Sequence, residues 1–325
     1  MSEDSTPIPV VSFERFLTGD RQCQEQVAKQ VYNAFSTVGF IYLKDHGIPL
    51  DRVQQIFDLS KTFFTLPLEE KLQYRLRDAS VNQGYTADGA EGVNEHKECY
   101  EHRRFRNDWC PSESILPGFK DTLDDFYKQC FTLSMNVLTC LAMVMELGDD
   151  FFVPITKHAD PQLRLLHYPQ IERKMVETAG HARIHAHTDF GLCTLLFQGD
   201  VGGLEIDPWH TGEFVAAPPI PGTVLVNIAD LLQRFTNDRV KSTRHRVVSP
   251  SVDRDVDGLL PARFSIPFFV HPDPETTIDP ITLSEGEKKL YPPVNAGEWR
   301  TWHTATNYHM KENEVGTGNE VNVAG

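Results

Sequence analysis

The chain has 325 residues, and its 31 basic and 46 acidic side chains give a formal net charge of −15 at pH 7. A surface this acidic repels phosphate backbones and anionic lipid headgroups, which excludes nucleic acid and membranes as favoured partners. Hydrophobic residues make up 40% of the chain, so it can bury a large core, and its length predicts one large domain with helical additions.

The cysteines and the start of the chain indicate a cytoplasmic protein. No basic stretch followed by an apolar run opens the sequence, and no run approaches the ~18 apolar residues of a membrane span. The six cysteines are widely spaced and form no Cys-x-x-Cys pair, which is typical of reduced packing residues.

The first third of the chain predicts mixed helix and strand. Apolar residues recur at helical spacing over 21–39, and a short buried strand is expected at 40–43. A second helix is predicted over 53–64, and Pro67 prevents it from continuing. Residues 77–118 are polar and rich in glycine and proline, so we expect loops with short strands there.

The remainder of the chain predicts one long helix followed by a β-rich region. A single apolar stripe runs from Phe126 to Val144, and the helix should end near Gly148. Thr211-Gly212 is a hairpin signal between two short β-rich runs. The expected strands are 163–168, 190–197, 204–206, 214–216, 223–228, 243–248 and 263–270. Many short strands with intervening turns favour a sandwich or barrel, of which a jelly roll is one form.

A histidine and an aspartate two residues apart could bind one metal ion if they lie on a strand, where alternate side chains share a face. The His-x-Asp pattern occurs three times, at 158–160, 187–189 and 271–273, so the pattern alone is weak evidence. Only His187-Thr-Asp189 leads into a predicted strand, and a further histidine, His245, lies on another β-rich run.

Two histidines and one carboxylate can occupy one face of an octahedral metal, as in non-haem Fe(II) oxygenases, and leave three positions open. A structural zinc site would require four closed ligands, commonly cysteines. His185 falls on the same predicted strand face as His187, so it is an alternative ligand, although packing or support of a ligand is favoured.

Arg263-Phe-Ser265 is the only Arg-x-Ser pattern in the chain, and strand alternation places both polar side chains on one face. An arginine beside a hydroxyl suits a carboxylate. A surface arginine on an edge strand is the alternative. The apolar run that follows favours an inward-facing strand, on which a buried arginine needs an anion.

Together these motifs resemble the Fe(II)/2-oxoglutarate-dependent dioxygenases, most closely the isopenicillin N synthase-like family. Residues 38–49 and 63–71, Gln83-Gly-Tyr85 and Lys97-Glu98 are similar to the N-terminal region of that family. Residues 202–206 and 221–230 also agree, and the resemblance extends from about residue 7 to 300. It implies an α+β protein with a double-stranded β-helix (jelly-roll) core, an N-terminal mixed α/β region and flanking helices.

The expected organisation has five parts. These are an N-terminal mixed helix/strand region of the non-haem dioxygenase type (1–118), a long supporting helix (119–160), the jelly-roll Fe(II)/2-oxoglutarate dioxygenase core (161–275), a C-terminal helical segment (276–310) and a disordered tail (311–325).

The resemblance also implies roles for individual residues. His187, Asp189 and His245 match the iron ligands, and Arg263 and Ser265 match the pair that holds the distal carboxylate of 2-oxoglutarate. Tyr168 matches a tyrosine that often hydrogen-bonds the same carboxylate. The implied cofactors are Fe(II), 2-oxoglutarate as co-substrate and O2, with ascorbate as a reductant in vitro.

Candidates for substrate contact come from the expected pocket rim, although core packing is the commoner role for such residues. They are Tyr85, Tyr100, Phe105, Leu166, Phe190, Phe197, Trp299 and Trp302. A rim of this kind favours a small organic molecule, such as a specialised metabolite, as the substrate.

The predicted function is oxidation of an unactivated C–H bond by hydroxylation, desaturation or rearrangement, with release of succinate and CO2. One alternative is an oxidase that, like isopenicillin N synthase itself, consumes no 2-oxoglutarate. A non-enzymatic ligand-binding protein on the same scaffold is less favoured because the triad is intact. Oligomeric state is not predicted.

Overall fold

The computed structural model describes residues 6–76, 82–90, 94–103, 110–178, 181–250, 255 and 257–307. Its centre is a pair of β-sheets, one of eight strands and one of four. In spatial order, the large sheet contains β1 (Val10–Ser12), β2 (Phe40–Lys44), β11 (Thr223–Ile228), β8 (Cys193–Gln198), β14 (Arg263–Val270), β5 (Gln162–Tyr168), β4 (Glu98–Arg103) and β3 (Gly84–Thr86). The small sheet contains β10 (Val215–Ala216), β9 (Leu204–Ile206), β12 (His245–Val247) and β7 (Ile184–His187).

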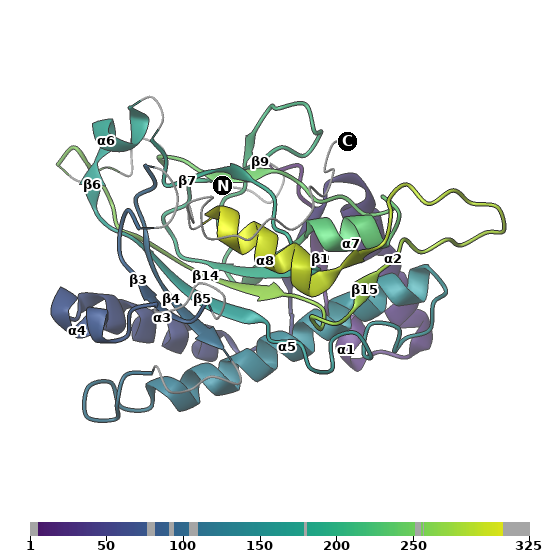
Figure 1. The fold of residues 1–325 in the computed structure, drawn as a ribbon, viewed down its shortest axis with the longest axis horizontal. Helices are drawn as coiled ribbons and strands as arrows, with labels where there is room; N and C mark the ends of the chain where they lie inside the picture. The colour runs from purple at the N-terminus through teal and green to yellow at the C-terminus, as the bar shows by residue number, and fades with distance from the viewer. Residues whose placement is uncertain are drawn as a thin grey trace.

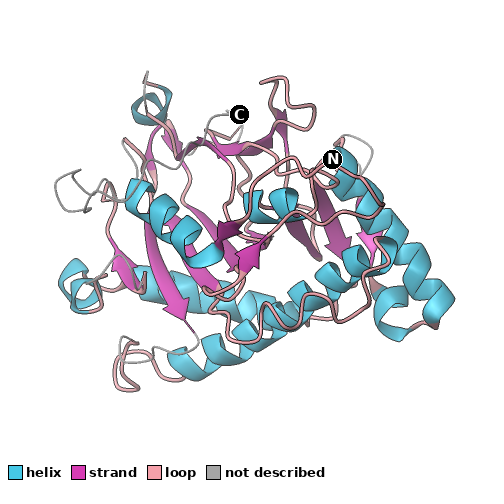
Figure 2. Cartoon of the chain, turned by 45° about the vertical axis from the view of Figure 1, so that its right-hand side comes forward, coloured by secondary structure: helices cyan, strands magenta, loops and turns pink. Residues whose placement is uncertain are grey.

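From β5 to β14 the chain passes repeatedly between the two sheets, which is the connectivity of a double-stranded β-helix. Figure 2 shows the strands of both sheets with the helices around them. Two further two-stranded sheets pair β6 (Ile171–Glu172) with β13 (Leu259–Leu260) and β15 (Thr277–Ile278) with β16 (Val294–Asn295).

The helices predicted from apolar spacing are confirmed. They correspond to α2 (Arg21–Thr37), α3 (Leu50–Thr65) and α5 (Phe119–Val144), and α5 runs along the large sheet in Figure 1. Gly39 follows α2 with a φ of +76°, and a Cβ there would lie 2.3 Å from the Lys241 carbonyl oxygen. Glycine is therefore needed where this turn approaches the loop before β12. The remaining helices are α1 (Glu14–Thr18), α4 (Leu68–Gln73), α6 (Arg173–Glu177), α7 (Asp230–Phe235) and α8 (Ala296–Asn307).

Two buried clusters lie on opposite sides of the large sheet. The helix-side core joins the apolar faces of α2, α3 and α5 to one face of that sheet. The inter-sheet cluster contains residues of both sheets, among them Cys99, Leu166, Tyr168, Leu225, Ile206 and Val247. Because neighbouring residues of a strand point to opposite sides, strands of the large sheet such as β2, β4, β5 and β11 contribute to both clusters.

The β-rich runs mostly coincide with strands, but the expected strand at 190–197 begins only at Cys193, and the strand expected around His185 and His187 is β7, which ends at His187. At Gly191 a Cβ would lie 2.4 Å from the Val270 carbonyl oxygen, so the backbone crosses close to the end of β14 before β8 starts. The predicted hairpin is confirmed, because β9 and β10 pair antiparallel on either side of Thr211-Gly212.

β2, β3 and β4 come from the first third of the chain but belong to the same sheet as β5, β8, β11 and β14. None of the helices in the described ranges is long and apolar enough to cross a membrane. Phe105 and the expected disordered tail at 311–325 lie outside the described residues.

Candidate active site

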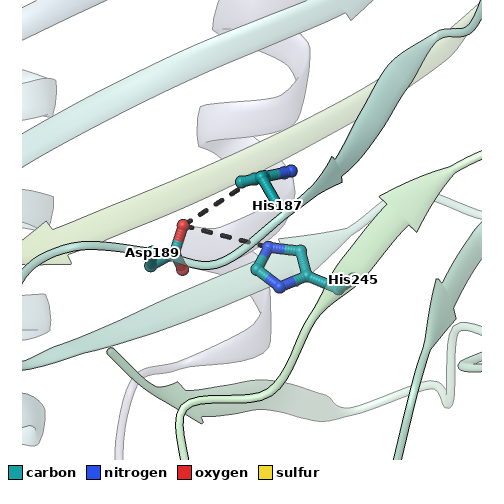
Figure 3. A group of neighbouring side chains, drawn as sticks. All are labelled: His187, Asp189 and His245. Carbon is teal, nitrogen blue, oxygen red and sulfur yellow. Dashed lines mark ion pairs between the residues drawn. The ribbon is translucent and has the colours of Figure 1, made fainter. Parts of the chain in front are cut away.

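His187, Asp189 and His245 come together at one end of the small sheet. His187 is the last residue of β7 and lies opposite His245 of β12 in the antiparallel register. The Nε2 atoms of His187 and His245 lie 3.9 and 3.8 Å from Asp189 Oδ1. Figure 3 shows both imidazoles and the carboxylate directed toward a common point.

The convergence does not arise as the sequence suggested. Asp189 lies beyond the end of β7, in the connection to β8, so His187 and Asp189 do not share a strand face. Instead, hydrogen bonds to β8 and β11 hold the carboxylate. Its Oδ2 accepts from Thr194 Oγ1 at 2.6 Å and from Asn227 Nδ2 at 2.8 Å, which leaves Oδ1 facing the imidazoles.

Backbone carbonyls orient both imidazoles. His187 Nδ1 donates to the His185 carbonyl oxygen at 2.8 Å, and His245 Nδ1 donates to the Thr243 carbonyl oxygen at 3.1 Å. A carbonyl can only accept, so the proton lies on Nδ1 in each ring and Nε2 presents a lone pair. Such support is typical of histidines that bind metals.

The protonation states also suit a cation. Burial, together with the charge of His245, lowers the pKa of His187 to about 4. Burial alone would raise the pKa of Asp189, but the nearby imidazoles and the hydrogen bonds from Asn227 and Thr194 outweigh it and lower that pKa. Near neutral pH the site therefore offers a neutral His187 imidazole and an ionised Asp189 carboxylate, the forms that bind metal.

The donor set fits Fe(II). The three ligand atoms lie within 4.8 Å of one another, and in the described part of the chain no other group of three His, Cys, Asp or Glu side chains meets this criterion. Two nitrogens and one oxygen on one side leave the opposite side open, as in non-haem iron oxygenases. His185 is exposed and is not part of the group, and its carbonyl orients His187.

Arg263 and Ser265 face the space between the sheets, because Phe264 between them packs against the helix-side core. Arg263 is 2% exposed, and its Nη1 donates to Ser265 Oγ at 3.0 Å while its Nε donates to the Gly202 carbonyl at 2.9 Å. Its Cζ lies 4.7 Å from the centre of the Tyr168 ring, its partner in the β5–β14 register. Within the described ranges, no carboxylate forms an ion pair with this guanidinium.

The seven candidates for substrate contact that the structure describes separate into different environments. Leu166 belongs to the inter-sheet cluster, beside Tyr168. Tyr85, Tyr100 and Phe197 instead belong to the helix-side core, so the structure does not bring them to the triad. Their alternation within β3, β4 and β8 turns them away from it. Phe197 also lines a separate cavity of about 720 Å³ beside α3, whose lining includes no triad residue.

Trp299 and Trp302 lie on α8, and Phe190 lies beside that helix. The Phe190 ring stacks between His271 and His303, with centroid distances of 5.3 and 5.1 Å. Trp299 Nε1 donates to the Phe190 carbonyl at 2.9 Å, so it ties α8 to the residue that follows Asp189. Trp302 is 54% exposed and touches His303 edge-on.

Sequence reasoning missed a polar wall on β4 and β5. Glu101 alternates with Cys99, a member of the inter-sheet cluster, and so shares its side of the sheet; Lys97 directly precedes β4, and its charge acts on His187. Glu101 pairs with Arg164, and Lys97 pairs with Glu95. Glu95 Oε1 also accepts from the His185 backbone N–H at 2.8 Å, which links this wall to β7. Charged residues at this density are typical of a loop, so hydrophobic patterning held no signal for them.

Comparison with known proteins agrees with this geometry. Two protein-family models match the chain. The family described as "non-haem dioxygenase in morphine synthesis N-terminal" matches residues 8–118, and the 2OG-Fe(II) oxygenase superfamily matches residues 159–272. Proline hydroxylase buaE of Petromyces alliaceus is 36% identical, over 82% of this chain and 89% of its own length. The 2-oxoglutarate-dependent dioxygenase ecdK of Aspergillus rugulosus is 32% identical, over 84% and 90%.

Among solved structures, a full-length Neurospora crassa protein in complex with alpha-KG is 35% identical, with a TM-score of 0.85 over 94% of this chain and 98% of that one. JOX2, 22% identical with a TM-score of 0.76, shares the fold. Fold and donor set together define a non-haem iron oxygenase. The chain belongs to the 2-oxoglutarate-Fe(II) oxygenase superfamily, so it is an oxidoreductase with Fe(II) as cofactor and 2-oxoglutarate as co-substrate.

Proposed function

We propose that His187, Asp189 and His245 hold Fe(II), and that Arg263 and Ser265 hold the distal carboxylate of 2-oxoglutarate. One observation carries the proposal: Arg263 is buried in the same inter-sheet space as the triad. Among the described residues, no carboxylate forms an ion pair with it. With O2, the bound iron and 2-oxoglutarate supply the oxidising power that cleaves a C–H bond and release succinate and CO2.

The protein's own contribution is to fix charge and position. Thr194 and Asn227 hold one carboxylate oxygen of Asp189, so the other keeps its direction toward the metal. Arg263 would neutralise the far end of the co-substrate, since a buried carboxylate without a partner costs several kcal/mol. Ser265 already accepts a hydrogen bond from that guanidinium and thereby sets its orientation.

We propose a small polar metabolite as the substrate. Lys97, Glu101 and Arg164 support this, because they form a charged wall on the inter-sheet side where aromatic residues were expected. The relatives also favour small molecules: one is named a proline hydroxylase, and the Neurospora crassa protein has been solved with thymine and with 5-formyluracil. We further propose a reducing, cytoplasmic setting, in line with the six free cysteines.

The test is a screen of metabolite pools with Fe(II), ascorbate and 2-oxoglutarate, with products detected by mass. One succinate formed for each substrate oxidised is the expected stoichiometry. Substrate oxidation without succinate would indicate the oxidase type of reaction instead. Iron titration of the wild type against His187→Ala tests the metal ligands separately, and equal Fe(II) affinity would refute the assignment.

A further inference from the structure

Arg183 is a second buried arginine that the proposed function does not use. It precedes β7 and is 0% exposed. Its Nη2 donates to the Pro261 carbonyl oxygen at 2.9 Å, while its Nε and Nη1 are shielded from solvent and have no hydrogen-bond partner in the described part of the chain. A buried guanidinium left in this state is energetically costly, so its retention needs a reason.

Its surroundings point to the co-substrate end of the inter-sheet space. The Cζ atom of Arg183 lies 5.8 Å from the centre of the Tyr168 ring, the same ring that lies 4.7 Å from the Cζ of Arg263. Two guanidinium groups therefore lie close to one aromatic ring. Burial and the charge of Arg263 lower the pKa of Arg183 to about 10, which leaves it charged at neutral pH.

The two cations lack the neutralisation found elsewhere in the protein. Arg173, a neighbour of Arg183, pairs with Asp255 at 2.6 Å and with Glu177 at 2.9 Å. Neither Arg183 nor Arg263 pairs with a carboxylate among the residues that the structure describes. This end of the inter-sheet space therefore carries uncompensated positive charge, which an anionic ligand would neutralise.

We propose that Arg183 is a positioning residue for 2-oxoglutarate: it holds the Tyr168 ring against Arg263 and adds its own positive charge to the subsite for the distal carboxylate. The inference rests on the proposed function, in which Arg263 binds that carboxylate. Since Nε and Nη1 of Arg183 are shielded, it acts through the ring and through the electric field. It should therefore favour ligands that carry a distal carboxylate beyond their metal-chelating group over ligands that only chelate the metal.

The test compares two ligands by calorimetry on the Fe(II)-loaded enzyme without O2. 2-Oxoglutarate has a distal carboxylate, whereas oxalate chelates the metal and has none. Arg183→Met should weaken 2-oxoglutarate binding about tenfold and leave oxalate binding unchanged. The melting temperature of the metal-free variant should equal or exceed that of the wild type, because an uncompensated buried charge is removed.

A structural role for Arg183 predicts a different result. If its bond to the Pro261 carbonyl mainly holds the fold, Arg183→Met would lower the melting temperature and weaken both ligands equally, which would overturn the inference. Arg183→Gln is the second variant, since it keeps a donor for that carbonyl and removes only the charge. Failure of both variants to fold would also show a structural role.

Two controls separate this inference from the proposed function. Arg173→Met removes a nearby positive charge that two carboxylates already neutralise, so 2-oxoglutarate binding should not change. Arg263→Met tests the proposed function itself. Unchanged 2-oxoglutarate affinity there would refute the subsite, whereas loss there together with normal affinity in Arg183→Met would refute only the role of Arg183.

Discussion

The two sides of the large sheet differ in whether their buried polar groups have partners within the protein. On the helix-facing side the charged groups form closed sets within the protein. Glu98 pairs with Lys71 at 2.8 Å and with His167 at 2.7 Å, and His102 bonds Asp124 at 2.8 Å. On the inter-sheet side several groups keep a free position: Asp189 Oδ1 faces only the two imidazoles, and Arg263 has no ion-paired carboxylate within the described ranges.

This difference separates structural from functional polarity. A buried polar group normally has its partners within the protein, because an unmade hydrogen bond in the interior costs free energy. Polar groups between the sheets that lack such a partner indicate that a bound ligand supplies it. Polar substitutions on the helix-facing side should therefore change stability, whereas those on the inter-sheet side should change binding and turnover.

The largest effect is expected from Asp189→Ala. Loss of the one carboxylate in the triad should abolish turnover and Fe(II) binding, because two imidazoles alone hold the ion weakly. Iron titration and product formation measure the two losses. Asp124→Ala, which removes a carboxylate from the helix-facing side, is the control and should keep its activity. Retained turnover in Asp189→Ala would rule out this ligand set.

Arg263→Ala should have the next largest effect. Truncating one partner of a buried charged contact costs about 2–5 kcal/mol, which corresponds to a rise in the KM for 2-oxoglutarate of roughly 30-fold or more. Fe(II) binding should stay near normal, because Arg263 is not among the triad ligands. Steady-state kinetics and iron titration measure the two quantities. An unchanged KM would contradict the role given to this side chain.

The helices and most strands could be predicted from the sequence because their signals are local. The apolar stripes of α2, α3 and α5 are visible at helical spacing, and they pack as that spacing implies. Short strands were expected within 77–118, but β4 could not be placed there, because all six of its residues are buried although four are polar or charged. Their partners, such as Lys71 and Arg164, come from distant parts of the chain, which a local pattern cannot reveal.

The triad and Arg263-x-Ser265 could be named from motifs, but the environment of each residue could not. Asp189 reaches the site from a connection whose geometry depends on contacts of Gly191 with β14. Tyr100 and Phe197 looked like pocket residues because aromatic side chains suit both cores and pockets. Only strand register shows which side of the sheet each one faces. Arg183 belongs to no motif, so its position near Tyr168 became apparent only in three dimensions.

Tyr100→Ala tests the helix-facing side directly. Tyr100 is fully buried and packs against the rings of Phe63 and Phe119. Its removal should cost about 3–5 kcal/mol of the free energy of unfolding, the usual range for a large aromatic side chain. Denaturant unfolding measures this loss. The KM values for 2-oxoglutarate and substrate should not change in the folded fraction. A selective rise in the substrate KM would instead indicate that Tyr100 contacts the substrate.

The smallest effect is expected from the pH dependence of stability through His271, at the end of β14. Burial, together with the charges of Arg103 and Arg300, lowers the pKa of His271 to about 3, although Asp189 acts in the opposite direction. An unfolded histidine has a pKa of about 6.5, so the unfolded state binds more protons between these values. Stability from His271 is therefore fully present above about pH 6.5 and falls by about 1.4 kcal/mol per pH unit below it.

The comparison of metal-free wild type with His271→Gln isolates this contribution, because His187 titrates with the same sign in both proteins. Urea unfolding from pH 7 to pH 5 should show a steeper loss of stability in the wild type. Nδ1 of His271 is buried without a hydrogen-bond partner among the described residues, although His271 is not in the triad. Equal slopes would mean that the pKa of His271 is not lowered in the folded protein, because its Nδ1 gains a hydrogen-bond partner in solution. His271 would then be a polar group that the protein itself pairs, as Glu98 and His102 are.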